Sequence, residues 1–153
     1  MFRWMCALVM GFSLSVQAAD LSIVDAKGER HIIKTTKLME QFPADPIVTK
    51  NPWAPDTHTY TGIDMQALLE HYGLADQALR LIALDNYSVI MQPGEIQSLQ
   101  SPILAVEKDG QALTRRDFGP SWLIVDFDKY PELDVERTRN LSIWQLAEIA
   151  PES

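Results

Sequence analysis

Short apolar stretches alternate with turn residues along most of the chain, and this aperiodic mixture predicts both strands and helices. Near the start, the segments 21–24 and 30–33 predict two short strands. Lys27-Gly28 lies between them, so we expect a hairpin. The segment 35–42 then predicts one or two helical turns.

The clearest helix is predicted at 65–72, where apolar side chains recur near helical spacing. Asp64 is a good N-cap residue, and Gly73 is a good C-terminal stop. Farther along, the strand-like segments 79–84 and 87–91 flank Asp85-Asn86. Both turn residues tolerate positive φ, so we expect a second hairpin there.

The remaining segments are strands, loops and one ambiguous element. The apolar segments 103–106 and 122–127 predict two more strands. The proline-rich segment 43–55 predicts a loop with a short extended piece, and the charged segment 128–140 predicts a second loop. The final segment, 141–149, is compatible with a helix by propensity and with a closing strand.

The first 18 residues predict a signal peptide. Arg3 precedes the mostly apolar segment 4–16, and Val16 and Ala18 are small enough for a signal-peptidase site. The apolar segment is shorter than the about 20 residues that span a membrane, and an uncleaved anchor is the alternative. We therefore expect a periplasmic protein in which residues 19–153 form a single domain.

Composition narrows the classes of function. The chain's one cysteine, Cys6, lies in the predicted signal peptide, so the mature protein has no disulfide, thiolate metal ligand or thiol nucleophile. The net charge of −8 argues against nucleic acid and anionic membranes as partners. This net charge does not exclude an anionic small molecule that binds in a local basic pocket.

Common catalytic and metal-binding motifs are absent from the sequence. There is no G-x-S-x-G elbow and no Gly-rich phosphate loop. His31, His58 and His71 lack the spacing of metal ligands, and the acidic segment 126–134 lacks the spacing and glycine of an EF-hand. We therefore predict no catalytic residue and no metal ion.

Five short patterns say more than the composition does. They are YTGIDMQALLEHYGL (60–74), ALDNYSVIM (83–91), ILAVEKDGQAL (103–113), RRDFGPSWLIVDFD (115–128) and LSIWQLAEI (141–149). In this order they resemble the molybdopterin-binding domain of the sulfite oxidase superfamily, and more narrowly its small stand-alone periplasmic members that bind pterins. The resemblance covers nearly all of residues 19–153. It implies an α+β fold of mixed β-structure with few short helices, and a pterin held in a cleft between loops.

The sequence departs from the enzymes of this superfamily at three places. In the enzymes, a cysteine in the loop before the helix ligates molybdenum, whereas the segment 43–61 has none. The enzymes also tend to carry an arginine just after Gly-Pro and a lysine before the tryptophan of the last pattern. Here those regions read Ser121-Trp122 and Ile143-Trp144. The resemblance therefore implies a pterin cofactor, free pterin more than molybdopterin, without metal.

A pterin is a flat bicyclic ring, so its site needs aromatic faces and a few fixed polar groups. A carboxylate suits the amino-pyrimidine edge because it accepts two parallel hydrogen bonds. The matching patterns and the loop before them supply seven candidates: Trp53, Tyr60, Tyr87 and Trp122 for stacking, and Asp85, Arg116 and Asp117 for polar contacts. Each has a structural alternative, such as core packing for the aromatics and turn formation for Asp85. We interpret 115–122 as the rim of the cleft.

Three functions are compatible with this interpretation. The first is a non-catalytic periplasmic pterin-binding protein that acts as a ligand sensor for a transmembrane signalling partner, such as a cyclic-di-GMP enzyme, because the small family members are associated with such control. The second is a molybdopterin-dependent oxidoreductase, or a subunit of one. The third is an interaction domain that keeps the fold without the cofactor. Bound small molecules and molybdenum content discriminate among them.

Overall fold

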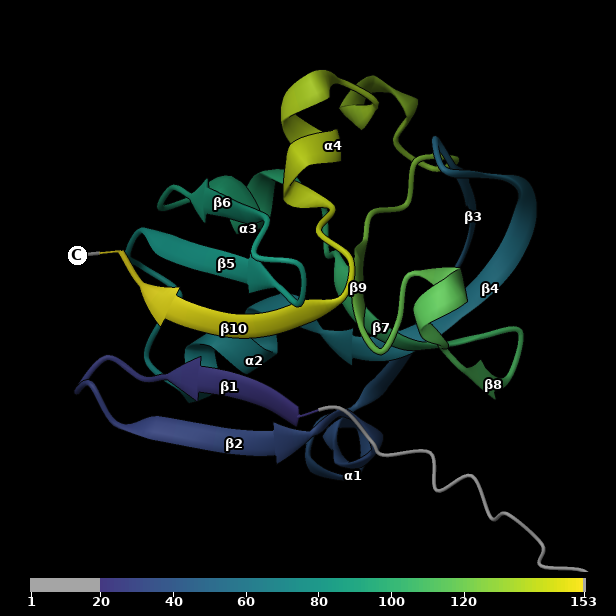
Figure 1. Cartoon of the computed structure of the whole chain (residues 1–153). Helices are drawn as coiled ribbons and strands as arrows, with labels where there is room; N and C mark the ends of the chain where they lie inside the picture. The colour runs from purple at the N-terminus through teal and green to yellow at the C-terminus, as the bar shows by residue number, and fades with distance from the viewer. Residues whose placement is uncertain (1–19, 153) are drawn as a thin grey trace, which may run out of the picture.

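Two β-sheets form the centre of the protein, which a computed structural model describes over residues 20–152. The strands of the first sheet are β1 (Asp20–Val24), β2 (Arg30–Lys34), β5 (Leu79–Ala83), β6 (Ser88–Met91) and β10 (Leu146–Pro151). They lie in the order β2-β1-β10-β5-β6 (Figure 1). β1 and β10 are parallel and the other neighbours are antiparallel, so the sheet is mixed.

The second sheet is antiparallel. Its strands are β3 (Ala44–Asn51), β4 (Ala54–Asp64), β7 (Ile103–Lys108), β8 (Gln111–Ala112) and β9 (Trp122–Ile124). They follow the order β3-β4-β7-β8, and β9 pairs with β7. The long strands β3 and β4 curve along one side of the molecule (Figure 1).

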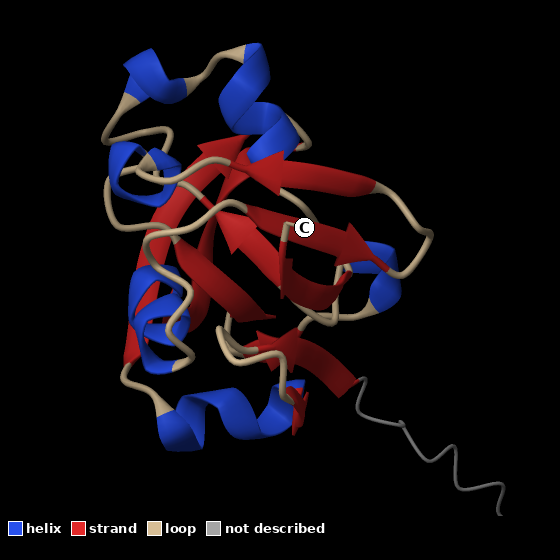
Figure 2. Cartoon of the chain, turned by 90° about the vertical axis from the view of Figure 1, so that its left-hand side faces the viewer, coloured by secondary structure: helices blue, strands red, loops and turns tan. Residues whose placement is uncertain are grey.

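Short helices lie around the outside of the strands (Figure 2). They are η1 (Thr35–Lys37), α1 (Leu38–Gln41), α2 (Met65–His71), α3 (Glu95–Ser98), η2 (Arg115–Asp117), η3 (Pro131–Leu133) and α4 (Glu136–Leu141). Within residues 20–152, none of the helices has the length and apolar character needed to span a membrane.

The main core lies where both sheets meet α2. Leu21 and Ile149 from the first sheet, Leu104 from the second and Leu68 from α2 are each 0% exposed. Full burial of one such side chain contributes about 1.5–3 kcal/mol. A second, smaller core contains Trp122 and its neighbours in the second sheet, and it supports the candidate site described below.

Several predicted elements are confirmed. The predicted hairpin at 21–33 is the antiparallel pair β1–β2, and the segment 35–42 forms η1 and α1. The predicted helix is α2, with Asp64 as its N-cap, which accepts hydrogen bonds from the amides of Gln66 and Ala67. The predicted second hairpin is β5–β6, and Asn86 in its turn has a φ of 68°.

The extended piece predicted around Ile47-Val48 is confirmed, but the loop predicted for the rest of 43–55 is wrong, because this segment forms β3 and the start of β4. β3 is an edge strand, where a proline such as Pro46 costs no ladder hydrogen bond if its nitrogen faces outward. Its inward positions alternate regularly, but two of the three inward residues, Thr49 and Asn51, are polar. The alternation of apolar and polar residues that marks a strand was therefore absent from the sequence.

The prediction of a loop at 128–140 is also wrong from Pro131 onward, where the chain forms η3 and most of α4. α4 begins after Val135, which provides no side-chain cap, so the usual N-terminal signal is absent. The ambiguous segment 141–149 contains the end of α4 and most of strand β10, which is held between β1 and β5. The predicted strand at 122–127 is shorter than expected, because β9 ends at Ile124.

The paired strands β4 and β7 approach each other too closely at Gly62 for any side chain. A Cβ atom there would lie 1.9 Å from the carbonyl oxygen of Leu104 and 2.6 Å from the Cα of Ala105. The β4–β7 register also shifts between Thr61 and Gly62. Glycine is therefore required at this position by backbone approach rather than by a positive φ.

We expect the substitution Gly62→Ala to destabilise the protein by about 3 kcal/mol, at the upper end for an overpacked site, because β4 or β7 must move. Urea unfolding followed by circular dichroism measures this change. The control is Gly28→Asn, because Gly28 has open space around it at a φ of +84° and asparagine tolerates positive φ. If the Gly62→Ala protein were as stable as the parent, the two strand backbones could not lie as close together at Gly62 as the structure shows.

Candidate functional site

A pocket of about 290 Å³ lies between the β3–β4 turn, the β5–β6 turn and the chain from α4 to β10. This volume is close to the lower end of the about 300–1,000 Å³ that is usual for small-molecule sites. Its lining residues are Trp53, Ala83, Asp85, Tyr87, Arg139, Asn140, Ser142, Ile143 and Trp144. The lining combines aromatic rings with one carboxylate and one guanidinium.

Beside the pocket lies an aromatic cluster formed by Trp53, Tyr60, Phe118, Trp122 and Trp144. The ring centroid of Trp53 lies 5.3 Å from that of Trp144 and 6.1 Å from that of Trp122, in edge-to-face geometry. Trp122 is only 1% exposed, whereas Trp53 and Trp144 are partly exposed and line the pocket. Edge-to-face pairs of this kind contribute about 0.5–1.5 kcal/mol each beyond the burial of area.

Asn51 fixes the turn that carries Trp53. Its side-chain oxygen accepts hydrogen bonds from the backbone amides of Trp53 (3.0 Å) and Ala54 (2.9 Å). Its side-chain amide donates to the hydroxyl of Tyr60 at 3.2 Å, inside the aromatic cluster. Burial raises the pKa of Tyr60, so its hydroxyl stays neutral at physiological pH.

The β5–β6 turn places Asp85 and Tyr87 at the pocket. One carboxylate oxygen of Asp85 accepts the amide of Tyr87 at 3.1 Å, and the ring hydroxyl of Tyr87 donates to the backbone carbonyl of Asn140 at 3.3 Å. The second bond ties the turn to the end of α4. Within the described residues, the other carboxylate oxygen of Asp85 has no hydrogen-bond partner and can accept one from a ligand.

An ion pair holds α4 in place. The guanidinium of Arg137 donates to both carboxylate oxygens of Glu95, at 2.7 and 2.6 Å, and to the backbone carbonyl of Ile90 at 2.6 Å. These contacts lower the pKa of Glu95 and raise that of Arg137. Because Glu95 is in α3 and Ile90 is in β6, this pair anchors the helix that contributes Arg139 to the pocket.

The predicted site residues fall into three groups. Trp53, Asp85 and Tyr87 line the pocket. Tyr60 and Trp122 are buried in the aromatic cluster, where Trp122 contacts the lining residues Trp53 and Trp144.

The third group, Arg116 and Asp117, lies outside the pocket lining. Both side chains are exposed on η2, where Asp117 lies 3.8 Å from the ammonium of Lys108. Their contact with a ligand stays a prediction, and so does the interpretation of 115–122 as a rim. Of that segment, Phe118 and Trp122 reach the aromatic cluster.

Sequence reasoning missed six lining residues: Ala83, Arg139, Asn140, Ser142, Ile143 and Trp144. Trp144 stands in a pattern that carries the resemblance, but its apolar neighbours favoured a core position. Arg139 and Asn140 lie in the segment predicted as a charged loop, because α4 has no capping signal. The sequence favours a solvated position for Arg139, with contact to an anionic substituent as the alternative. No local feature of the sequence brings the end of α4 to the β5–β6 turn.

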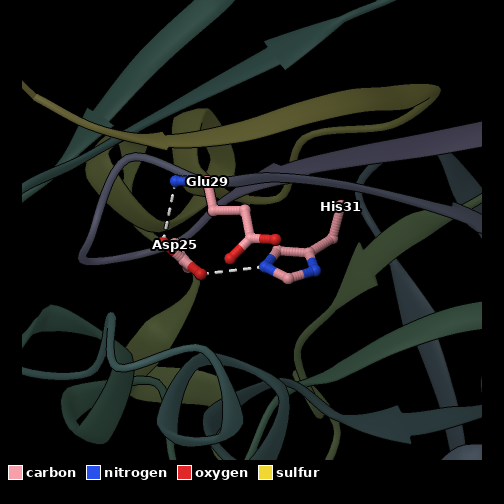
Figure 3. A group of neighbouring side chains, drawn as sticks. All are labelled: Asp25, Glu29 and His31. Carbon is pink, nitrogen blue, oxygen red and sulfur yellow. Dashed lines mark hydrogen bonds and ion pairs between the residues drawn. The ribbon is translucent and has the colours of Figure 1, made fainter.

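A second group of polar side chains lies at the β1–β2 hairpin, away from the pocket lining (Figure 3). Asp25, Glu29 and His31 each place a donor atom within 4.8 Å of the other two, and these residue types are common ligands of Zn²⁺. The ring nitrogen Nε2 of His31 lies 2.8 Å from Asp25, so a hydrogen bond between the two side chains by itself accounts for this contact. The predicted absence of a metal stays a prediction.

Comparison with known proteins bears on the fold. No protein-family profile matches the sequence, and no curated protein matches it. Among solved structures, the chain is similar to the sulfane dehydrogenase SoxCD from Paracoccus pantotrophus, with a TM-score of 0.60 and 15% sequence identity. The match covers 90% of this chain and 39% of the SoxCD chain.

The fold is distantly similar to a molybdopterin-binding domain. The predicted α+β fold of mixed β-structure with few short helices is confirmed, and the similarity is consistent with the predicted sulfite oxidase molybdopterin-domain type. At 15% identity the similarity shows the fold alone. Because the chain spans well under half of the matched chain, the activity of that protein does not transfer with the fold.

The lowered pKa of Asp25 predicts that the stability of the protein depends on pH. Hydrogen bonds from His31 and from the amides of Glu29 and Lys27 hold its pKa below the usual value of 3.8. A carboxyl whose pKa falls on folding stabilises the native state above its unfolded pKa, and this contribution is lost as the pH falls through the folded pKa. We expect Asp25→Asn to lower the free energy of unfolding at pH 7 and to have a shrinking effect below about pH 4.

Urea unfolding of both proteins between pH 7 and pH 3 measures this difference. Asparagine keeps an oxygen that can accept the two turn amides, so the comparison isolates the charge and its contact with His31. The matched control is Asp76→Asn, an exposed acid for which the described residues offer no ion pair. A difference between parent and Asp25→Asn that stays constant down to pH 3 would argue against the lowered pKa.

Proposed function

We propose that this protein binds a pterin in the pocket lined by Trp53, Asp85 and Trp144, and that it acts without catalysis of its own as a periplasmic ligand sensor. The observation that carries the proposal is a small pocket with aromatic walls and an available carboxylate, on a fold of the molybdopterin-domain type. A flat heterocycle with a hydrogen-bonding edge matches both features.

Aromatic side chains supply the apolar contacts of the proposed complex. Trp53 and Trp144 line the pocket, and Tyr87 is 47% exposed at its edge. Covering a ring of Tyr87 with a ligand removes apolar surface from water at about 25 cal/mol per Å². The aromatic cluster holds Trp53 and Trp144 in fixed orientations, so binding costs little side-chain entropy there.

Asp85 is the polar anchor in the proposed complex. Amino-pyrimidine rings present adjacent N–H donors, and a carboxylate accepts two such bonds in parallel. One oxygen of Asp85 already accepts the amide of Tyr87, which fixes the carboxylate, and that oxygen keeps further lone pairs for a ligand. The carboxylate is thus oriented before the ligand arrives.

The residues of the pocket do not fit a molybdenum centre of the enzyme type. Residues 20–152 contain no cysteine, and the lining residues include no histidine. Molybdenum in the related enzymes uses a protein thiolate, so the chain lacks the group that would hold the metal. This composition supports binding over redox catalysis, although the matched structure is a sulfane dehydrogenase.

The sensor role and the periplasmic location rest on the resemblance and on the predicted signal peptide. The small stand-alone family members are associated with transmembrane signalling proteins, including cyclic-di-GMP enzymes, and we propose a partner of that kind. A binding module changes such a partner only through a ligand-dependent difference in its own surface. The pocket opens beside exposed Tyr87, so an occupant alters that surface directly.

The proposal is tested on protein purified from the periplasm of its source. The protein is denatured, and the released small molecules are identified by mass spectrometry and pterin fluorescence, with molybdenum quantified in the same sample. We expect about one pterin per chain and no molybdenum. Molybdenum in matching amount would favour the oxidoreductase alternative, and failure of added pterins to bind would leave the interaction-domain alternative.

We expect Asp85→Asn to weaken pterin binding about tenfold, which corresponds to about 1.4 kcal/mol, because a charged acceptor is lost while the turn is kept. Quenching of pterin fluorescence in a titration measures the affinity. Asp76→Asn is the matched control, since it makes the same change at an exposed acid outside the pocket lining. Equal affinities for the two variants would remove Asp85 from the site.

A further inference from the structure

We propose that the pocket selects a pterin that carries an anionic substituent, and that Arg139 is the residue that recognises the anion. This inference rests on the proposed pterin-binding function and adds the chemical class of the ligand's side chain. It assigns a cation at a place where the family resemblance does not expect one. The resemblance expects cations near Ser121 and Ile143, where this chain has none.

The first observation is that the Arg139 guanidinium uses only part of its hydrogen-bonding capacity. Its Nε donates to a carboxylate oxygen of Asp134 at 2.7 Å. Within the described residues, the two terminal nitrogens, Nη1 and Nη2, have no hydrogen-bond partner. A guanidinium has five N–H donors, and the terminal pair forms a fork that matches a carboxylate or phosphate group. The bond to Asp134 restricts the side chain while leaving the fork available.

The second observation is the distribution of charge around the pocket. Among the lining residues, Arg139 is the single cation and Asp85 is the single anion. They come from different elements, Arg139 from α4 and Asp85 from the β5–β6 turn. A ligand with N–H donors on one edge and an anion elsewhere complements both groups, whereas an uncharged pterin leaves Arg139 unused.

The third observation is that the wall carrying Arg139 is held from two sides. Arg137 ties α4 to Glu95 and to the carbonyl of Ile90. The hydroxyl of Tyr87 donates to the carbonyl of Asn140, next to Arg139. Pre-positioning of the helix lowers the cost of ordering the site when the anion binds.

The overall charge of the protein makes a local cation necessary for such a ligand. The net charge is −8, so the long-range field repels an anion. Asp134 and Glu136 add negative charge close to Arg139. The Arg139 side chain is 46% exposed, so water and salt screen its attraction, and the preference for an anion is therefore moderate.

The test compares two ligands that share the ring: pterin-6-carboxylate, which is anionic, and 6-hydroxymethylpterin, which is neutral. Their dissociation constants are measured by fluorescence titration with the parent protein, Arg139→Gln and Arg139→Lys. We expect the parent to bind the carboxylate about tenfold more tightly. Arg139→Gln should bring the ratio near one while keeping the affinity for the neutral pterin, and Arg139→Lys should give an intermediate ratio because lysine lacks the fork.

Arg30→Gln is the matched control, since it removes the same charge from an exposed arginine that is also paired with a carboxylate and lies outside both the pocket lining and the segment 115–122. It should leave the ratio at the parent's value. The parent's ratio should also fall as salt is raised from 50 to about 500 mM, because the contact is partly exposed. Equal binding of both pterins by the parent, or a ratio unchanged in Arg139→Gln, would overturn this inference alone. Failure of both pterins to bind the parent would overturn the proposed function itself.

Discussion

The packing of Trp122 joins the two sheets, and the pocket depends on this junction. Trp122 starts β9 of the second sheet and is 1% exposed. Its indole nitrogen donates to the carbonyl of Ser142 at 3.2 Å, and its backbone bridges to Trp144. The amide of Leu123 donates to the carbonyl of Ile143. The chain that leads into β10 of the first sheet is therefore fixed against β9, with three lining residues between α4 and β10.

Buried polar groups complete the junction from the other side. Thr49 and Asn51 point into the protein from edge strand β3, and each has a hydrogen-bond partner. Among the described residues, no buried side-chain nitrogen or oxygen is left without one. An unpaired buried polar group costs about 1–3 kcal/mol, so these contacts permit one arrangement of the β3–β4 turn. This arrangement also sets the position of Trp53, because the backbone amide of Trp53 donates a hydrogen bond to the side-chain oxygen of Asn51.

The sequence predicted what local signals determine and missed what tertiary contacts determine. α2 has both a capping residue, Asp64, and a regular apolar face, and the β5–β6 turn has Asn86 at positive φ, so both elements were predictable. β3 was not, because its inward side chains are polar. α4 was not, because its position comes from Arg137, whose partner Glu95 lies 42 residues away.

The candidate site divides in the same way. Trp53, Asp85 and Tyr87 stand at turns that the sequence marks with proline, aspartate and asparagine, and these three line the pocket. Trp122 was proposed for the same site, but its apolar setting at the start of β9 makes it the support of the pocket wall rather than a part of its lining. Arg116 lies on η2 outside the lining, and its contact with a ligand stays a prediction. Long-range pairing of α4 with β6 brings in the missed residues, and no window of the sequence contains both elements.

In the proposed complex, the aromatic side chains provide most of the affinity and the charged side chains set the orientation of the ligand. Aromatic walls favour any flat ring, and they tolerate rotation of the ring within its plane, because stacking depends mainly on the overlap of faces. Asp85 and Arg139 have opposite charges and lie on separate elements, so a ligand that contacts both is restricted in its in-plane orientation. Because each charged group is partly exposed, neither gives strong affinity alone. Under this proposal, discrimination among pterins would depend on the substituent that reaches Arg139, while the ring would supply the part of the binding energy that all pterins share.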